Sequence, residues 1–490
     1  MVRAHYPKVR HYRIPDDALI RILEYLDPRS LFLVGKAFKR VYALTMTYHT
    51  LRYNIELAVA GMRDGSTLLQ YAPILARLHL LSSYRLDWPQ LNWTHEFKIQ
   101  APGPAHIGVS GGFIHQIRPH GVYNTVEITE LPSCRTGRTP ALTRHRSFPT
   151  PPFETMAIDS MQGLMIGVHI FCQNGIIGVQ IHIRDLWTSG KHPRAAAESY
   201  ELATQSLVPV AEASLVIQGK KIALTLEFAD GKTSHLFMDW RNLGARWIDD
   251  QDILMLDSDL LLVISNQGGH TPMLSLFNIS YLARMSLIRQ FELPPHWVPS
   301  SVKFAGNKAA RTAVPGSLFY PDPTNRVMVI EAKSITSKSA SWLFINEVYF
   351  STAPYRRRES HVVPWSLWGQ YSAIKDFSRS KKSANIRGPY PVGSRVVYLD
   401  SERSHRGALN VIEFEPFPEK APRLDSSWSV VGPRSGLFPS ENSRRLPSAT
   451  VESYGVDELG VTEDNIVLFL EPQADFQPLN VLTFGAPKMK

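Results

Sequence analysis

Few residues of this chain could do covalent chemistry, and the strongest candidate is Ser110. Gly108, Ser110 and Gly112 fit the Gly-x-Ser-x-Gly pattern, in which a strained turn exposes a nucleophilic serine. That turn needs a strand before the serine and a helix directly after it. Residues 113–119 alternate in polarity like a strand, so the sequence does not predict the required helix. A serine hydrolase using Ser110 is therefore kept only as an alternative interpretation.

Phosphate-binding and metal-binding patterns are weaker still. Residues 231–233, Gly-Lys-Thr, match the end of a P-loop, but position 226 is Leu where that loop needs glycine. The 17 histidines show neither His-x-x-x-His nor His-Glu-x-x-His spacing. Cys134 and Cys172 are too far apart in sequence to form the closely spaced cysteine pair of a zinc site. We expect no catalytic residue, no cofactor and no metal, and we interpret the chain as a non-catalytic protein.

The first 90 residues have helical periodicity. Pro15 suits the first position of a helix, and Asp16 and Asp17 follow in the first turn, where negative charge favours the helix dipole. An apolar stripe then recurs at spacings of three and four, formed by Leu19, Ile22, Leu23 and Leu26. Asp27 is predicted to cap a second helix that starts at Pro28. Further helices are expected over residues 51–62 and 73–84.

A helical unit of this size cannot bury all of its apolar residues by itself. One interpretation is that the stripe packs on the helices that follow it. The other is that part of it stays open for a helix of a partner protein. The sequence leaves both interpretations open and predicts that residues 14–90 form an all-α unit after a basic, disordered tail over residues 1–13.

From residue 91 the pattern changes to short apolar or alternating runs separated by polar or glycine turns. These runs form seven pairs, which begin near residues 106, 156, 213, 253, 318, 395 and 461. Repeats of three or four strands are typical of a β-propeller, which leaves few strand edges exposed. We predict a degenerate seven-bladed β-propeller over residues 91–490, closed by pairing of residues 466–470 with residues 106–117. A pair of β-sandwiches is the alternative, and either way the fold class is α+β and multidomain.

Three stretches of the predicted β domain look like connecting loops. They are rich in Arg, Ser, Thr, Pro or Gly and lack periodicity, and they cover residues 132–152, 379–393 and 421–450. Loops on one face of a propeller are a common location for binding residues.

Composition and charge limit the function classes. The chain has 490 residues, of which 44% are hydrophobic, and only two are cysteine, which favours a globular protein of a reducing compartment. No apolar run is long enough to span a membrane. Residues 1–90 contain 13 Lys and Arg against 7 Asp and Glu, so +6 of the total net charge of +9 lies there. The densest basic runs, at residues 356–358 and 381–382, lack interleaved aromatics, so we expect no nucleic-acid partner.

The N-terminal region resembles an F-box. The resemblance rests on Ile14-Pro15, Leu23, Tyr25-Leu26-Asp27-Pro28, Leu31 and Val34-Gly35-Lys36-Ala37-Phe38. Residues 51–62 resemble the segment that follows the box in a fungal type of F-box protein. Residues 111–113, 131–133 and 363–369 are similar, more weakly, to the C-terminal region of that group. The second helix, however, is shorter than in the family.

The resemblance implies a substrate-receptor subunit of a ubiquitin ligase of the Skp–cullin–F-box kind. Its partners would be a Skp-type adaptor, a cullin bound through that adaptor, and an unidentified substrate protein held by the β domain. The implied location is the cytoplasm, the nucleus or both, without a membrane partner. Adaptor binding is expected from Ile14, Pro15, Ile20, Leu23, Leu26, Asp27, Pro28, Leu31, Val34 and Phe38. The alternative is a non-ligase propeller scaffold whose shortened box does not bind the adaptor.

Overall fold

The structure of this chain is a computed structural model. It describes residues 14–65, 72–102, 106–121, 123–139, 141, 143–173, 175–204, 206–249, 252–265, 271–298, 300–305, 315–334, 339–352, 362–377, 385–401, 407–416, 426–432, 436–446, 455–473 and 476–485. The tail predicted over residues 1–13 lies outside these ranges.

The N-terminal part of the chain is helical, as the periodicity predicts. Its helices are α1 (Asp16–Glu24), α2 (Pro28–Ala37), α3 (Lys39–Thr47), α4 (His49–Val59) and α5 (Ile74–Asp87). The carboxylate of Asp27 accepts hydrogen bonds from the backbone N–H groups of Arg29 and Ser30, which confirms it as the cap of α2. Pro15 precedes α1 as its N-cap residue, one position earlier than predicted. None of the helices in the described ranges is long and apolar enough to cross a membrane.

The rest of the chain is a seven-bladed β-propeller, so the sandwich alternative is wrong. The described residues form seven separate sheets, each with four antiparallel strands, and two of these sheets have a fifth strand. Blades 1 to 3 consist of β3 (His106–Ser110), β4 (Phe113–His120), β5 (Tyr123–Glu130) and β6 (His145–Thr150); β7 (Thr155–Asp159), β8 (Leu164–Gln173), β9 (Ile176–Asp185) and β10 (Ser199–Ala203); and β11 (Val210–Gln218), β12 (Lys221–Phe228), β13 (Thr233–Asp239) and β14 (Ala245–Asp249).

Blades 4 to 6 continue the ring, and short helices α6 (Val348–Thr352) and α7 (Trp365–Trp368) lie in the connections. These blades consist of β15 (Asp252–Met255), β16 (Leu260–Ser265), β17 (Met273–Asn278) and β18 (Ser286–Glu292), with β23 (Val362–Val363) added; β19 (Ser300–Ala305), β21 (Val327–Ser334), β22 (Ala340–Asn346) and β24 (Ser372–Phe377), with β28 (Trp428–Val431) added; and β25 (Asn385–Val392), β26 (Arg395–Ser401), β27 (Gly407–Phe414) and β29 (Pro439–Arg445).

Blade 7 closes the ring by joining two distant parts of the chain. It consists of β30 (Val456–Val461), β31 (Asn465–Leu470) and β32 (Phe476–Thr483), with β2 (His95–Pro102) as its outer strand. Strand β2 pairs with β32 along its full length, from His95 opposite Thr483 to Pro102 opposite Phe476. Closure by an early strand was predicted, but the strand is β2, whereas residues 106–117 form β3 and β4 of blade 1.

The first strand of each blade is the innermost one. First strands of neighbouring blades lie side by side, as β3 does with β7, β7 with β11, β19 with β25, and β30 with β3. Because strands alternate in direction within a blade, the turns between first and second strands all lie on one face of the ring. We call this the turn face, and the opposite side the entry face.

The three predicted loops are in part strands of blades. Strand β6 lies within residues 132–152, β25 within 379–393, and β28 and β29 within 421–450. Strands β6, β28 and β29 are the outermost of their sheets. An outermost strand is more exposed to solvent than the inner strands, so its sequence does not need regular apolar alternation. Residues 140, 142, 379–384, 421–425, 433–435 and 447–450 of these segments lie outside the described ranges.

Candidate protein-interaction surface

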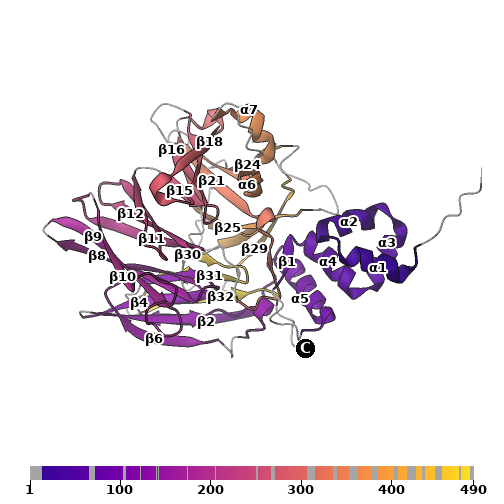
Figure 1. The fold of residues 1–490 in the computed structure, drawn as a ribbon, viewed down its shortest axis with the longest axis horizontal. Helices are drawn as coiled ribbons and strands as arrows, with labels where there is room; N and C mark the ends of the chain where they lie inside the picture. The colour runs from indigo at the N-terminus through magenta and orange to yellow at the C-terminus, as the bar shows by residue number, and fades with distance from the viewer. Residues whose placement is uncertain are drawn as a thin grey trace, which may run out of the picture.

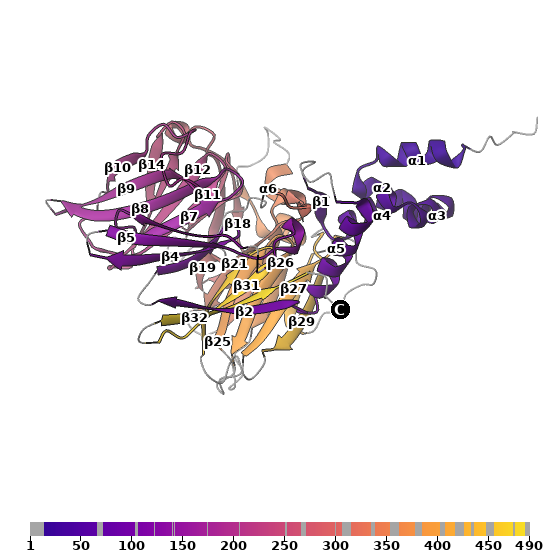
Figure 2. The ribbon, with the colours of Figure 1, turned by 90° about the horizontal axis from the view of Figure 1, so that it is seen from below.

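The helices α1 to α5 with strand β1 (Met62–Asp64) form a projection that we call the helical arm. Figures 1 and 2 show α1, α2 and α3 at the end of the molecule, with α5 and β1 between them and the blades. The outer part of the arm has its own small core, made of Ile20, Leu23, Leu31, Val41, Leu44 and Leu51. That core holds α1 to α4 together without any residue of the propeller.

Large apolar side chains remain exposed on this outer part of the arm. Phe38, Tyr42 and Met46 follow one another at intervals of four residues, so they form a stripe along one face of α3. Tyr25, between α1 and α2, is 90% exposed, and Phe38 is 60% exposed. We define the tip surface as these exposed residues together: Ile14, Ile22, Tyr25, Leu33, Phe38, Tyr42, Met46 and Tyr48. An apolar concentration of this kind typically marks a site of association with another protein.

The residues that the sequence predicts for adaptor binding separate into two groups. Ile20, Leu23 and Leu31 are buried in the core of the arm, and Leu26 and Val34 pack partly against it. Pro28 is half-buried at the start of α2. The remaining members of the set, which are Ile14, Pro15, Asp27 and Phe38, are exposed. The first group shapes the arm, and only the second is open to a partner protein in this structure.

Four members of the tip surface were not singled out from the sequence, namely Leu33, Tyr42, Met46 and Tyr48. Ile22 belongs to the stripe that one interpretation left open for a partner, and Tyr25 to the corner on which the resemblance rests, but neither was named for adaptor binding. A signal for it was present in α3, where Val41 and Leu44 form one apolar stripe and Phe38, Tyr42 and Met46 form a second. A helix of a small unit can bury one such stripe against its neighbours, so a second stripe predicts an exposed apolar face.

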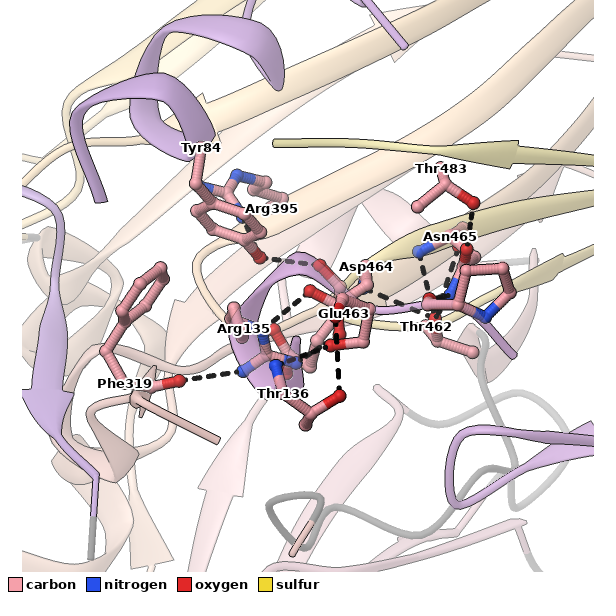
Figure 3. A network of polar contacts seen from close by, with 12 residues as sticks. Tyr84, Arg135, Thr136, Phe319, Arg395, Thr462, Glu463, Asp464, Asn465 and Thr483 are labelled. Atoms are coloured by element: carbon pink, nitrogen blue, oxygen red, sulfur yellow. Dashed lines mark hydrogen bonds and ion pairs between the residues drawn. The ribbon is translucent and has the colours of Figure 1, made fainter. Parts of the chain in front are cut away.

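Tyr84 links the inner part of the arm to the turn face of the propeller, beside two ion pairs that lie within the propeller (Figure 3). The hydroxyl of Tyr84, in α5, donates to the backbone carbonyl of Glu463 at 2.5 Å and accepts from Nη1 of Arg395 at 2.9 Å. Arg395 also pairs with Glu413 at 2.9 Å. Burial raises the pKa of the Tyr84 hydroxyl, so it remains protonated and able to donate at neutral pH.

The second ion pair joins Arg135 and Asp464 within the propeller, beneath the arm. Nε and Nη2 of Arg135 donate to the two carboxylate oxygens of Asp464 at 2.7 and 2.9 Å, and Nη1 donates to the carbonyl of Phe319 at 3.1 Å. Both side chains are almost fully buried. Burial raises the pKa of the neighbouring Glu463, and the charges of Arg135 and Arg395 oppose that shift. Removing one member of either buried pair, Arg135–Asp464 or Arg395–Glu413, would leave the charge of the other member without its partner.

Backbone pairing and apolar packing also attach the arm to the propeller. Strand β1 pairs with β20 (Phe319–Pro321), a short strand between the first two strands of blade 5. Trp88 stacks on Phe484, just after β32, with ring centroids 4.0 Å apart. One continuous core contains residues of α4, β1 and α5 together with residues of blades 6 and 7. The arm is thus attached to blades 6 and 7 and to strand β20. This attachment holds the tip surface at a fixed distance from the ring.

The Gly-x-Ser-x-Gly segment forms a β-hairpin. Ser110 is the last residue of β3, and Gly111 and Gly112 turn directly into β4, so the strand–turn–helix arrangement of a nucleophile elbow is absent there. The Ser110 Oγ accepts a hydrogen bond from the N–H of Ile158 at 3.0 Å and lies 3.5 Å from Nδ1 of His115. Burial lowers the pKa of His115 to about 3. Both side chains are buried, and Ser110 connects blade 1 to blade 2 through its hydrogen bond with Ile158.

A cavity of about 420 Å³ opens at the entry face, where blades 1, 2 and 3 meet. Its lining includes His106 at the start of β3, Glu154 before β7, Cys172 near the end of β8, and Glu212 in β11. Glu154 accepts the N–H of Ile170 and lies 3.5 Å from the imidazole of His169. Across the described ranges, no group of three or more His, Cys, Asp or Glu residues could hold a metal ion.

Comparisons with known proteins give only distant similarities. No protein-family model matches this sequence, and no curated protein sequence matches it. Among solved structures, the WD40 domain of SCAP from fission yeast is similar with a TM-score of 0.36 and 9% identity, over 80% of this chain and 83% of that one. An uncharacterized Listeria monocytogenes protein gives a TM-score of 0.39 and 10% identity, over 76% and 90% of the two chains.

The cobalt-substituted apocarotenoid oxygenase of Synechocystis is similar over a shorter region. Its TM-score is 0.29 at 8% identity, and the match covers 51% of this chain and 60% of that enzyme. We base the fold assignment on the seven sheets of this chain and take neither fold nor function from these low-scoring similarities.

Proposed function

We propose that this chain is the substrate-receptor subunit of a ubiquitin ligase of the Skp–cullin–F-box kind, acting in the cytoplasm or nucleus. The observation that carries the proposal is the tip surface, where Phe38, Tyr42 and Met46 are exposed at the end of a helical arm. Its helices α1 and α2 are joined by the Tyr25-Leu26-Asp27-Pro28 corner on which the F-box resemblance rests. Tyrosine, phenylalanine and methionine are enriched at protein interfaces relative to the rest of the surface.

The mechanism would be proximity, with the chain itself making and breaking no bonds. The arm would hold the adaptor and, through it, the cullin, while the propeller would hold the substrate protein. Other subunits would then transfer ubiquitin to a substrate lysine whose effective concentration has been raised. The fixed mount of the arm supports this proposal, because a receptor that bends freely would not keep the lysine near the transfer site.

The proposal is tested by co-purifying the full chain with a Skp-type adaptor. The informative variant is Phe38→Ala combined with Tyr42→Ala, since both side chains are exposed and their removal does not touch the core of the arm. A matched control is Tyr281→Ala, which removes an aromatic ring that is 79% exposed on the propeller.

We expect the wild-type chain and the Tyr281→Ala variant to retain the adaptor, and the double variant to lose it. If the wild-type chain retains no adaptor, the ligase proposal is overturned in favour of a propeller scaffold whose short second helix does not form an adaptor site. Equal retention by all three proteins would show that the tip surface is not the contact.

A further inference from the structure

Four arginines gather around two tryptophans on neighbouring blades, in a group that the proposed function does not use. Trp187 and Trp240 each follow the third strand of a blade, β9 in blade 2 and β13 in blade 3. The guanidinium groups of Arg144 and Arg146 lie 5.4 and 5.6 Å from the ring centre of Trp187. Those of Arg194 and Arg241 lie 5.9 and 5.0 Å from the ring centre of Trp240. We call these four arginines with their two tryptophans the arginine patch.

Gln162 brings two of these arginines together. Nη2 of Arg194 and Nη2 of Arg241 donate to the same Gln162 side-chain oxygen, at 3.4 and 3.0 Å. The amide nitrogen of Gln162 donates to Asp159 and to the carbonyl of Gly219, at 2.8 and 2.6 Å, which fixes the orientation of the amide. Two positive groups from different blades therefore converge on one amide oxygen, which carries no net charge to neutralise them.

The two halves of the patch are adjacent. A side-chain carbon at Gly163, the residue after Gln162, would lie 3.9 Å from the indole of Trp187. The backbone N–H of Leu186 donates to the carbonyl of Gly163, which holds the Trp187 segment against this turn. The turn between β7 and β8 thus lies beside the tryptophan of one half and binds the arginines of the other.

No carboxylate in the described part of the chain lies within 4.0 Å of a guanidinium nitrogen of Arg144, Arg146, Arg194 or Arg241. Two other arginines of the propeller that are about one-third exposed do have such partners, Arg118 with Glu127 and Arg387 with Asp457. The acidic residues close to the patch are engaged with backbone amides instead. Asp185 accepts the N–H of Trp187 and Thr188, and Asp239 accepts the N–H of Arg241.

We propose that the arginine patch binds an acidic segment of a partner protein. Guanidinium groups present paired N–H donors that fit the two oxygens of a carboxylate or phosphate, and an anion placed between converging arginines removes their mutual repulsion. Stacking on Trp187 and Trp240 restricts the arginines beforehand, so less side-chain entropy is lost when the anion binds. Aspartate or glutamate side chains and phosphorylated serines share this oxyanion chemistry.

The patch lies on the turn face, because Gln162 and Gly163 connect the first and second strands of blade 2. The arm is mounted on the same face, at Glu463 in the equivalent turn of blade 7. A segment bound at the patch would therefore lie on the side of the ring that carries the arm. That the segment belongs to a ubiquitination substrate rests on the proposed function, whereas the preference of the patch for acidic segments does not.

The test measures fluorescence anisotropy of labelled peptides of equal length with the full chain. One peptide contains glutamate and glycine, one phosphoserine and glycine, one glutamine and glycine, and one lysine and glycine. The test variant combines Arg194→Gln with Arg241→Gln. The matched control combines Arg118→Gln with Arg387→Gln, which removes the same charge from paired arginines on other blades.

We expect at least one acidic peptide to bind and the glutamine and lysine peptides not to. The test variant should weaken that binding by about tenfold or more, and added salt should weaken it further, while the control changes it little. Binding of the phosphoserine peptide alone would assign the site to phosphorylated segments, and binding of the glutamate peptide alone to carboxylate-rich ones. Failure of both acidic peptides to bind, or an equal loss in the control, would overturn the proposal. Co-purification of the adaptor with the test variant is measured separately. It should be unchanged, because the arginine patch is not part of the arm.

Discussion

The hydroxyl of Tyr84 and the backbone carbonyl of Glu463 are joined by a 2.5 Å hydrogen bond between the last helix of the arm and the first turn of the last blade. These two residues are separated by almost the entire propeller in sequence, yet the same hydroxyl also accepts from Arg395 of blade 6. The arm is thus attached where the ring closes, and its orientation depends on blades 6 and 7.

We expect Tyr84→Phe to loosen the arm. The change removes the donor to Glu463 and leaves Nη1 of Arg395 without that acceptor in a buried position. The loss of unfolding free energy should be about 1–3 kcal/mol, measured by chemical denaturation. Hydrogen exchange should accelerate at the amides of α5, and Tyr25→Phe, at an exposed position, should change neither quantity.

Asp464→Asn should be more damaging. It removes the charge that faces the buried Arg135 guanidinium while keeping the size of the side chain. Breaking one side of a buried pair costs roughly 3–5 kcal/mol, because the remaining charge is left without compensation. Asp16→Asn gives a control, since its partner Arg40 lies at the surface and the pair is solvated. Equal melting temperatures of the two variants would contradict this role for Arg135 and Asp464.

Substitutions at Leu23 and at Phe38 should have different effects, the first on stability and the second on adaptor binding. Leu23 is 2% exposed in the core of the arm, so Leu23→Ala should cost about 2–5 kcal/mol of unfolding free energy. Phe38→Ala removes an exposed ring and should leave the melting curve unchanged, while adaptor affinity falls by about 1–3 kcal/mol. Differential scanning calorimetry together with titration of the adaptor measures both quantities. Unchanged affinity in Phe38→Ala would argue against the tip surface.

The stability of the propeller should depend on pH through His115. Burial lowers its pKa from 6.5 to about 3, so the unfolded chain binds a proton there more readily than the folded chain. The stabilising contribution of neutral His115 is therefore complete above pH 6.5 and is lost as the pH falls from 6.5 toward 3. The slope should be on the order of 1 kcal/mol per pH unit, and His115→Gln should reduce it in urea titrations at several pH values.

The sequence predicted the repeat architecture because the second and third strands of most blades are strongly apolar. Leu164–Gln173 and Ile176–Asp185 are examples, and half or more of the residues in each are buried. Outer strands such as Pro439–Arg445 contain mostly polar and exposed residues, so their sequence pattern is that of a loop. The closing strand β2 was missed because its partners follow it by hundreds of residues and leave no local signal.

The candidate site was predictable in part for a similar physical reason. Local rules of capping and periodicity located α1 and α2 and the cap at Asp27. They did not separate the apolar residues that fill the core, such as Leu31, from those that remain exposed, such as Tyr42, because that division depends on how the helices pack. The arginine patch combines residues from three blades, so no sequence motif contains it.

The pairing of β2 with β32 also sets an order of events during synthesis on the ribosome. The outer helices have their own core and can fold as soon as they emerge, whereas the mount of α5 requires residues of blade 7 and Phe484. A chain whose translation stops before Thr483 would therefore display the tip surface together with the uncovered apolar side of α5. We expect such incomplete chains to be preferred clients of chaperones, because the apolar side of α5 is covered only after residues as far as Phe484 have been added.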